Sequence, residues 1–269
     1  MTIGVAELGS VATEPEPTAT PLLPRDGPPN AGRSGLTGAG SRDPIASAAG
    51  LAMTDFLDAL SPRDREALLA AGARRRYRRG DVLHREHDDP GGALVLLEGH
   101  VTASTADAEG REVILGMAGP GDLVGELSAL RGTPRSATVT AREDVVAVAI
   151  AAADFRRFLE RTPGAAVFVL DTVIERLQVA DAHRLELASL DVVARVARRL
   201  LELSERIGEA GAGGSVEVAV TQEELAAFAG ASREAVSKAL QVLRTLGCVE
   251  THRRRIAVLD AAALRRRAV

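Results

Sequence analysis

The chain has 269 residues, a formal net charge of −4 and one cysteine, and Phe, Tyr and Trp together make up 2% of it. At roughly 150 residues per domain this length suggests one or two domains, and the near absence of aromatic side chains argues against base-stacking RNA-binding platforms. A single cysteine excludes an internal disulfide and any four-cysteine iron–sulfur or zinc site, and it fits a cytoplasmic protein. The sequence has neither a membrane-spanning apolar run nor a secretory signal pattern.

Residues 1–50 differ in composition from the rest of the chain. They contain 7 of the 12 prolines and 8 of the 26 glycines. Such a segment cannot bury enough apolar surface to offset the entropy lost on ordering. We therefore predict a disordered tail over residues 1–52. Because Met53 follows directly, a translation start placed too far upstream is the alternative interpretation.

Residues 54–71 and 74–150 are predicted to form different kinds of structure. The first stretch has apolar residues at helical spacing, and Ser61–Pro62 is typical of a helix start, which predicts two short helices. The second alternates short strand-like runs with glycine-rich turns, a spacing typical of an antiparallel barrel or sandwich. The predicted strands are Arg74–Tyr77, Ala93–Leu97, His100–Ser104, Glu112–Met117, Ala137–Ala141 and Val145–Ile150.

The segment from Gly121 to Val139 combines glycines, a short predicted helix and an arginine. The start of the helix at Glu126 presents free backbone N–H groups, and Arg135 offers a planar fork to phosphate oxygens. Glu126 is suited to accept from a sugar hydroxyl, and Ser136 adds a hydroxyl donor. Together these groups predict a site for a ribose cyclic phosphate. In the plain alternative the glycines form turns, Glu126 is a helix-start charge and Arg135 is its salt-bridge partner.

Helical periodicity returns at Ala151–Arg161 and continues over Pro163–Ser189. The longer helix carries a heptad seam, with spacings of 3, 4, 3, 4, 3 and 4, made of Val167, Leu170, Ile174, Leu177, Asp181, Arg184 and Ala188. This seam predicts a homodimer joined by a parallel two-stranded coiled coil. Packing of the helix on its own barrel is the alternative, and the two can coexist on opposite faces. Asp181 is either neutralised by Arg184 or contacts a ligand held between barrel and seam.

The last 79 residues form the only basic part of the chain, with 13 basic and 10 acidic side chains against 20 and 27 elsewhere. A helix is predicted at Asp191–Ile207, then a flexible run at Glu209–Gly214, then strand, helix, turn, helix and hairpin. Thr221 begins the second of these helices with a capping box, and Ser232 caps the third after a glycine turn. This spacing predicts a helix-turn-helix, whose recognition helix lies in the major groove of DNA.

The exposed face of the predicted recognition helix carries groups that can read base edges. Arg233 can form a fork to guanine, Glu234 can accept from cytosine, and Lys238 can reach guanine or phosphate. Ser237 lies on the same face. The hairpin that follows resembles a wing whose basic tip, at Arg253 and Arg254, contacts phosphate. The alternative is a solvated face of an ordinary helical hairpin.

Both halves resemble the cyclic-AMP receptor/fumarate–nitrate regulator (Crp/Fnr) family of bacterial transcription factors over roughly residues 54–260. The segment from Gly121 to Val139 is similar to the family's phosphate-binding signature, and the runs Arg176–Val179 and Ser232–Val236 are close to its cyclic-AMP receptor branch. The resemblance implies an α+β chain, with a cyclic-nucleotide-binding β-roll over residues 53–162, a dimerisation helix over 163–189 and a winged helix-turn-helix over 190–269. It implies a homodimer on a palindromic operator in double-stranded DNA, with RNA polymerase as a further partner.

The resemblance also assigns site residues. In the family the acidic residue after the glycine binds the ribose 2′-hydroxyl and the arginine binds the cyclic phosphate, roles that fall on Glu126 and Arg135. The implied nucleotide-binding set is Gly125, Glu126, Leu127, Arg135, Ser136, Ala137, Ala180 and Asp181. The implied DNA-binding set is Thr221, Ser232, Arg233, Glu234, Ser237, Lys238, Arg253 and Arg254.

The chain departs from the cyclic-AMP receptor branch at the base-recognition positions. Where that branch has a Thr–Ser pair that contacts adenine, this chain has Ala180 and Asp181. A carboxylate is a natural partner for the N1–H and N2–H donors of guanine. The effector is therefore predicted to be cyclic AMP or cyclic GMP, with Asp181 favouring guanine; another guanine nucleotide, or weak and less selective binding, is the alternative. No cofactor is required and no metal site is predicted.

Two other classes remain open. A family member can bind DNA without cyclic nucleotide or sense another ligand, for example a haem held by His183, His84, His87 or His100. An enzyme or a regulatory subunit that binds nucleotide without DNA is the third interpretation. The sequence contains no nucleophile–base set, Walker loop or metal-spaced cluster, so we predict that the protein is not an enzyme.

Overall fold

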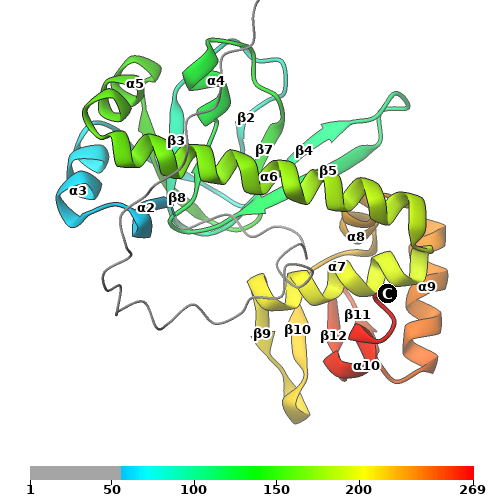
Figure 1. Cartoon of the computed structure of the whole chain (residues 1–269). Helices are drawn as coiled ribbons and strands as arrows, with labels where there is room; N and C mark the ends of the chain where they lie inside the picture. Colours follow the sequence, from blue (N-terminus) through cyan, green and yellow to red (C-terminus); the bar gives the residue numbers. More distant parts are fainter. Residues whose placement is uncertain (1–55) are drawn as a thin grey trace, which may run out of the picture. The chain divides into compact units, whose positions relative to one another are not determined.

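The structure is a computed structural model that describes residues 56–269, which fall in one compact unit (Figure 1). The predicted tail over residues 1–52 lies outside the described residues. Among the described helices, none is both long and apolar enough to span a bilayer.

Two short helices precede the strands, as the spacing predicts. Helix α2 covers Phe56–Ala59 and α3 covers Pro62–Ala70. The Oγ of Ser61 accepts a hydrogen bond from the backbone N–H of Asp64 (3.2 Å). Pro62 occupies the first turn, where a backbone N–H would have no partner within the helix, so the missing N–H costs no hydrogen bond. Both helices contribute buried side chains to the core that covers the first sheet of the roll.

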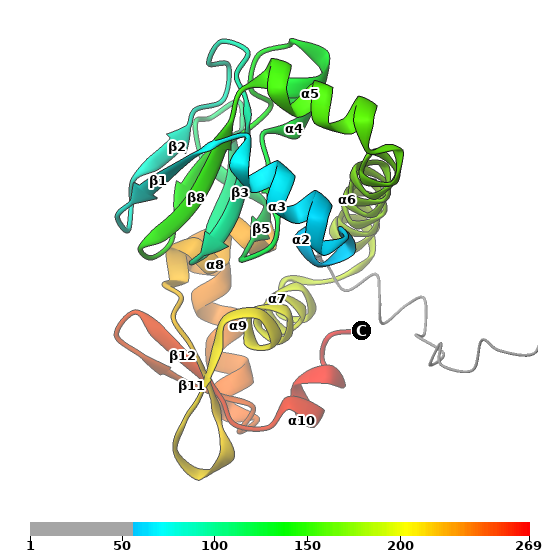
Figure 2. The ribbon, with the colours of Figure 1, turned by 90° about the vertical axis from the view of Figure 1, so that its left-hand side faces the viewer.

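The roll consists of two four-stranded antiparallel sheets (Figures 1 and 2). One has the order β1 (Ala73–Tyr77), β8 (Val145–Ile150), β3 (Ala93–Glu98) and β6 (Leu123–Val124). The other has the order β2 (Val82–His84), β7 (Thr138–Ala141), β4 (Val101–Ala106) and β5 (Glu112–Ala118). The six predicted strands lie within two residues of their expected bounds, whereas β2 and β6 are unpredicted because two or three residues show no alternation.

Three helices connect and cover the roll. Helix α4 (Glu126–Arg131) lies between β6 and β7, and α5 (Ala152–Arg161) follows β8. The long helix α6 (Pro163–Ser189) matches its prediction and is seen nearly end-on beside the roll in Figure 2. Ala165 and Val169 of α6 are buried in the core beside Phe155 of α5, so one face of α6 packs on its own roll.

The opposite face of α6 carries the predicted seam. Val167, Leu170, Ile174 and Leu177 are 43–59% exposed, although they are large apolar residues. Burial in water-excluding contacts is worth about 1.5–3 kcal/mol for each such side chain. An apolar stripe at heptad spacing is therefore left for another surface to cover.

The C-terminal module begins with α7 (Val192–Ile207). It continues through β9 (Gly208–Ala210), a 3₁₀ turn (Ala212–Gly214), β10 (Val216–Val218), α8 (Gln222–Ala229), α9 (Arg233–Thr245), β11 (Val249–His252), β12 (Arg255–Val258) and α10 (Ala261–Arg265). The prediction of a flexible run at Glu209–Gly214 is wrong in part, because β9 pairs with β10 in the sheet β11-β12-β10-β9. Helix α10 is also unpredicted.

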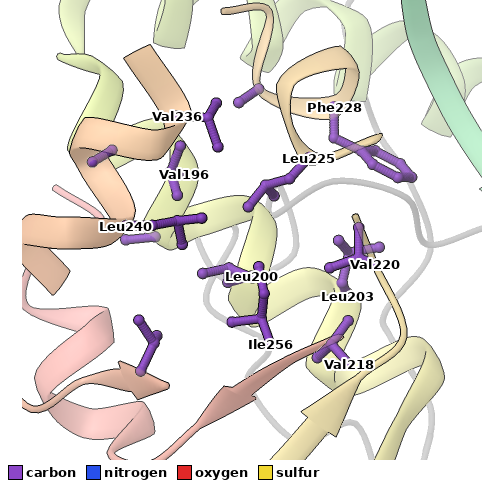
Figure 3. Packing of buried hydrophobic residues seen from close by; sticks show 14 of the residues in the cluster. Val196, Leu200, Leu203, Val218, Val220, Leu225, Phe228, Val236, Leu240 and Ile256 are labelled. Atoms are coloured by element: carbon purple, nitrogen blue, oxygen red, sulfur yellow. The ribbon is translucent and has the colours of Figure 1, made fainter. Parts of the chain in front are cut away.

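The module has a core built from α7, α8, α9 and the small sheet (Figure 3). Leu200 and Leu203 of α7 face Leu225 of α8 and Leu240 of α9, and all four are fully buried. Ile114 and Met117 of β5 in the roll belong to the same buried cluster. The cysteine, Cys248, is buried at the start of the wing.

Candidate nucleotide and DNA sites

The roll, α4, α6, α7 and α8 line a cavity of about 500 Å³, a volume typical of small-ligand sites. Its wall is mostly apolar and includes Val101, Val113, Met117, Val124 and Val139. Seven of the eight residues predicted to bind nucleotide line this cavity, namely Gly125, Glu126, Leu127, Arg135, Ser136, Ala137 and Ala180. The structure thus brings together residues that lie more than fifty positions apart.

Arg135 lies against the glycine that starts α4. Its Nη1 donates to the carbonyl oxygen of Gly125 (3.0 Å), and burial lowers the pKa of its guanidinium from the usual value. Gly125 has φ +76°, and a Cβ there would collide with the Arg135 guanidinium and crowd the carbonyl oxygen of Gly92. Only glycine fits both the left-handed backbone and the close approach.

Glu126 is the most deeply buried charge at the cavity, with 1% of its surface exposed. Its Oε1 forms an ion pair with Nη1 of Arg176 from α6, and Nη2 of Arg176 donates to the carbonyl oxygen of Leu123 (2.8 Å). The plain alternative is therefore wrong about Arg135 as the salt-bridge partner, whereas Glu126 does lie in the first turn of α4 after the turn at Gly125. The second oxygen, Oε2, is buried and has no hydrogen-bond partner among the described residues.

His84 of β2 also lines the cavity, and the sequence analysis named it only as a candidate haem ligand. Its Nδ1 lies 3.2 Å from the carbonyl oxygen of Ala137. Its Nε2 is buried without a partner in the described part of the chain. Burial, followed by the charge of Arg135, lowers the pKa of His84 to about 4.

Asp181 is the one predicted nucleotide residue that does not line the cavity. It is exposed on α6, and its Oδ1 accepts from Nη1 of Arg184 (2.7 Å). Of the two interpretations offered for Asp181, this contact corresponds to neutralisation by Arg184.

Two of the predicted DNA-binding residues cap helices. The Oγ1 of Thr221 accepts from the N–H of Glu224 (3.1 Å), and Glu224 Oε2 accepts from the N–H of Thr221 (2.7 Å), which completes the predicted capping box. The Oγ of Ser232 accepts from the N–H of Ala235 (3.2 Å) at the start of α9. Between the helices, Gly230 has φ +57°, as a tight turn requires.

The other predicted DNA contacts are exposed. Arg233, Glu234, Ser237 and Lys238 lie on the face of α9 opposite Val236, Leu240 and Leu243, which are buried in the core of the module. Arg253 and Arg254 form the two-residue turn between β11 and β12. Arg254 has φ +62°, typical of the turns that join tightly twisted strands.

A second cluster of charges lies where α6 meets α7, and we call it the corner cluster: His183, Glu186, Arg198, Arg199 and Glu202. Glu186 Oε1 accepts from Arg198 Nη1 (2.8 Å), while its Oε2 pairs with Arg199 Nη2. Nη1 of Arg199 donates to Glu202 Oε2 (2.5 Å) and to His183 Nε2 (2.5 Å). Glu186, Arg199 and Glu202 are at most 4% exposed.

Comparison with known proteins assigns both halves of the chain to families. Residues 74–162 match the cyclic nucleotide-binding domain, and residues 194–267 match the Crp-like helix-turn-helix domain. The CRP-like cAMP-activated global transcriptional regulator of Mycobacterium tuberculosis is 33% identical over 195 residues, which cover 71% of this chain and 86% of that protein. The cAMP-activated global transcriptional regulator CRP of Salmonella typhimurium is 30% identical over 164 residues, 61% of this chain and 78% of that protein.

Solved structures share the fold. A CRP-family transcriptional regulator from Thermus thermophilus aligns with a TM-score of 0.63 and 28% identity over 72% of this chain and 96% of that one. The c-di-GMP responsive global regulator CLP of Xanthomonas campestris aligns with a TM-score of 0.69 over 74% of this chain and 100% of that one. At 23% identity the second likeness concerns the fold alone.

Proposed function

Because this chain belongs to the Crp-like family of transcription regulators, whose members are not enzymes, we propose that it is a cytoplasmic homodimer that binds operator DNA in response to a cyclic nucleotide held in the β-roll. The observation that carries the proposal is the cavity wall. There Arg135 and Glu126 line one space, and Oε2 of Glu126 is buried without a partner among the described residues.

The cavity offers a partner to each part of a cyclic nucleotide. Arg135 supplies the charge and the fork for the cyclic phosphate, with the hydroxyl of Ser136 and the backbone N–H of Ala137 as further donors. Glu126 Oε2 is an acceptor for the ribose 2′-hydroxyl, since a buried carboxylate oxygen without a donor is unfavourable. Apolar side chains of β4, β5 and β7, together with residues of α7 and α8, line the remaining volume, which we assign to the base.

Arg176 connects the cavity to the seam helix. It reaches from α6 to Glu126 and to the carbonyl oxygen of Leu123. A nucleotide that hydrogen-bonds Glu126 changes the surroundings of the Arg176 guanidinium, and α6 carries that change along its length. Nucleotide then acts by shifting the population between two arrangements of the recognition helices.

We propose that the exposed seam of α6 is covered by a second copy of the chain. Leu170→Glu places a charge in that seam, so we expect the protein to sediment as a monomer at concentrations where wild type is a dimer. Leu259→Glu, which also charges an exposed leucine but lies outside α6, is the matched control and should leave the dimer intact. A dimeric Leu170→Glu protein would contradict the seam.

The decisive experiment combines calorimetry with DNA binding. Wild type is titrated with cyclic AMP and cyclic GMP, and duplexes selected from a random pool are then tested with and without the tighter ligand.

Two variants test the two sites separately. Arg135→Ala should abolish the nucleotide response with no change in fold, and Arg233→Ala should weaken specific DNA binding by about 1–3 kcal/mol. DNA binding that is unchanged by either nucleotide would favour the alternative, a regulator that acts without cyclic nucleotide or senses another ligand.

The identity of the base is a separate part of the proposal. Cyclic AMP and cyclic GMP are both candidates, and the preference for guanine rests on Asp181, whose carboxylate is paired with Arg184 on the exposed face of α6. If Asp181 contacts the base, Asp181→Ser should change the ratio of the two affinities. Contact with RNA polymerase is proposed from the family alone.

A further inference from the structure

We infer that His84 reads the base of the bound nucleotide, by accepting at Nε2 a hydrogen bond from an N–H group of a purine. The inference rests on the proposed function and adds a specificity-determining residue to the same cavity. Its starting observation is that two acceptor atoms of the cavity residues, Glu126 Oε2 and His84 Nε2, are buried without partners among the described residues.

The tautomer of His84 follows from its contact with the backbone. Nδ1 lies 3.2 Å from the carbonyl oxygen of Ala137, and a carbonyl oxygen can only accept. Nδ1 therefore carries the hydrogen. In a neutral imidazole the other nitrogen then has a lone pair and accepts.

The ring is held in that neutral form by its surroundings. Burial disfavours the charged form, and the guanidinium of Arg135 adds a repulsive charge, so the pKa of His84 lies at about 4 despite the opposing charge of Asp88. Around neutral pH, Nε2 is an acceptor and not a donor. A phosphate oxygen, which also only accepts, is therefore an unsuitable partner for it.

A cyclic nucleotide has hydrogen-bond donors in only two places. The 3′,5′-cyclic phosphate has none, the ribose keeps one hydroxyl at the 2′ position, and the base carries N–H groups. With Glu126 accepting from the hydroxyl, the base N–H remains for His84. The ligand class is a purine with an N–H donor, either the exocyclic amine of adenine or the N1–H and N2–H of guanine.

The experiment measures affinities of the full-length protein by calorimetry. The ligands are cyclic AMP, cyclic GMP, purine riboside 3′,5′-cyclic monophosphate, which lacks base N–H donors, and 2′-deoxy cyclic AMP. The proteins are wild type, His84→Leu, His84→Gln and His87→Asn. His87 is an exposed histidine three residues away at φ +66°, which asparagine tolerates, so it is the matched control.

We expect wild type and His87→Asn to bind the tighter of the two natural nucleotides at least tenfold better than the purine riboside ligand. His84→Leu should bind that nucleotide about tenfold more weakly and the purine riboside ligand with unchanged affinity. The variant should then no longer discriminate between the two ligands. His84→Gln keeps an acceptor oxygen and should restore part of that discrimination. The loss of affinity on removing the 2′-hydroxyl should be the same in His84→Leu as in wild type, because Glu126, not His84, accepts a hydrogen bond from that hydroxyl.

Three results would overturn the inference. His84→Leu could leave all affinities unchanged, or it could weaken every ligand equally, which would indicate a role in folding or phosphate binding. Unfolding curves of the variants separate a folding defect from a lost contact. If wild type binds none of the four ligands, the proposed function fails first, and this outcome is distinct because it needs no His84 variant.

Discussion

The Glu126–Arg176 pair and the corner cluster both join a charge of α6 to a buried charge of another helix, and both border the cavity, but they satisfy those charges differently. At the corner, both oxygens of Glu186 are paired, and Arg199 serves Glu186, Glu202 and His183 at once. In the cavity, Arg176 pairs with one oxygen of Glu126, while Glu126 Oε2 and His84 Nε2 have no partner among the described residues. Buried polar groups are normally paired, so the unpaired acceptors of the cavity residues call for an explanation, which the proposed ligand supplies.

One atom of the corner cluster breaks this contrast. Glu202 Oε1 is buried without a hydrogen-bond partner in the described structure. Burial is the largest influence on this carboxyl and raises its pKa to about 7, against the lowering effect of Arg199. The raised pKa favours the protonated carboxyl of Glu202, so an unpaired oxygen at this position does not by itself indicate a ligand.

Glu186→Ala is expected to have the largest effect on the closed network. It leaves Arg199 with one carboxylate and removes the carboxylate partner of Arg198, and breaking a buried ion pair costs about 3–5 kcal/mol. Denaturant unfolding measures the loss. Glu205→Ala, on the exposed side of α7, is the control and should cost less than about 1 kcal/mol. Similar losses in the two variants would remove the distinction between corner and surface.

Glu126→Ala tests the open network and should affect ligand binding more than stability. Charge-assisted hydrogen bonds are worth about 1.5–3 kcal/mol, so we expect nucleotide affinity to fall by about 10- to 100-fold. Arg176 is partly exposed and can recover water, so unfolding should cost less than for Glu186→Ala. Calorimetry and unfolding on the same samples make the comparison, and an effect on stability alone would contradict the assigned role.

Glu202→Gln should change how stability depends on pH. The folded pKa, about 7, lies above the unfolded value of 4.5, so the folded state is favoured at low pH and this contribution is lost as pH rises through 7. The free energy of unfolding of the variant should therefore rise relative to that of wild type between pH 5 and 8, by about 2 kcal/mol at pH 8. Thermal unfolding across that range measures it, and parallel curves would show that Glu202 stays ionised.

His183 acts in the opposite direction. Burial and the charge of Arg199 lower its pKa to about 4 from 6.5, so its contribution is complete above pH 6.5 and is lost as pH falls through 4. Between about pH 4.5 and 6.5 the two groups oppose each other. The contributions of Glu202 and His183 to the slope of unfolding free energy against pH can therefore be told apart only by comparing Glu202→Gln with wild type.

Arg198→Lys is expected to have the smallest effect. Nε and Nη2 of Arg198 both donate to the carbonyl oxygen of Ala268 (3.2 and 2.8 Å), which fastens the C-terminus to α7. Lysine keeps the charge for Glu186 but not the fork, so we expect a loss of about 1 kcal/mol. Carboxypeptidase should also remove the last residues faster from the variant than from wild type. An unchanged rate would show that the contacts of Arg198 do not hold this end of the chain.

Local signals in the sequence predicted much of the fold. Helix caps at Ser61, Thr221 and Ser232 and the heptad spacing of α6 are short-range patterns, and the structure contains the elements that they mark. The short strands β2 and β6 and the C-terminal helix α10 were missed because two to five residues give too little periodicity. The strand β9 was missed because its glycine-rich neighbourhood is typical of a loop, and only pairing with β10 makes it a strand.

The candidate site was predictable in part. The residues between Gly125 and Ala137 share one short segment whose composition indicates phosphate chemistry. The partner of Glu126 could not be predicted, because Arg176 lies fifty positions away and the contact depends on how α6 packs. His84 gives no signal either, because a lone histidine in a strand is common and only the fold shows that it lines the cavity with Nε2 buried and unpaired.

The core of the C-terminal module bears on how such regulators can be recombined. Ile114 and Met117, which belong to the roll, are buried in the cluster built by α7, α8 and α9. A cut at residue 190 therefore removes two side chains from the hydrophobic interior of the piece it releases. A chimera that gives this roll another DNA-binding module must therefore also supply a β5 whose side chains fit that module's core.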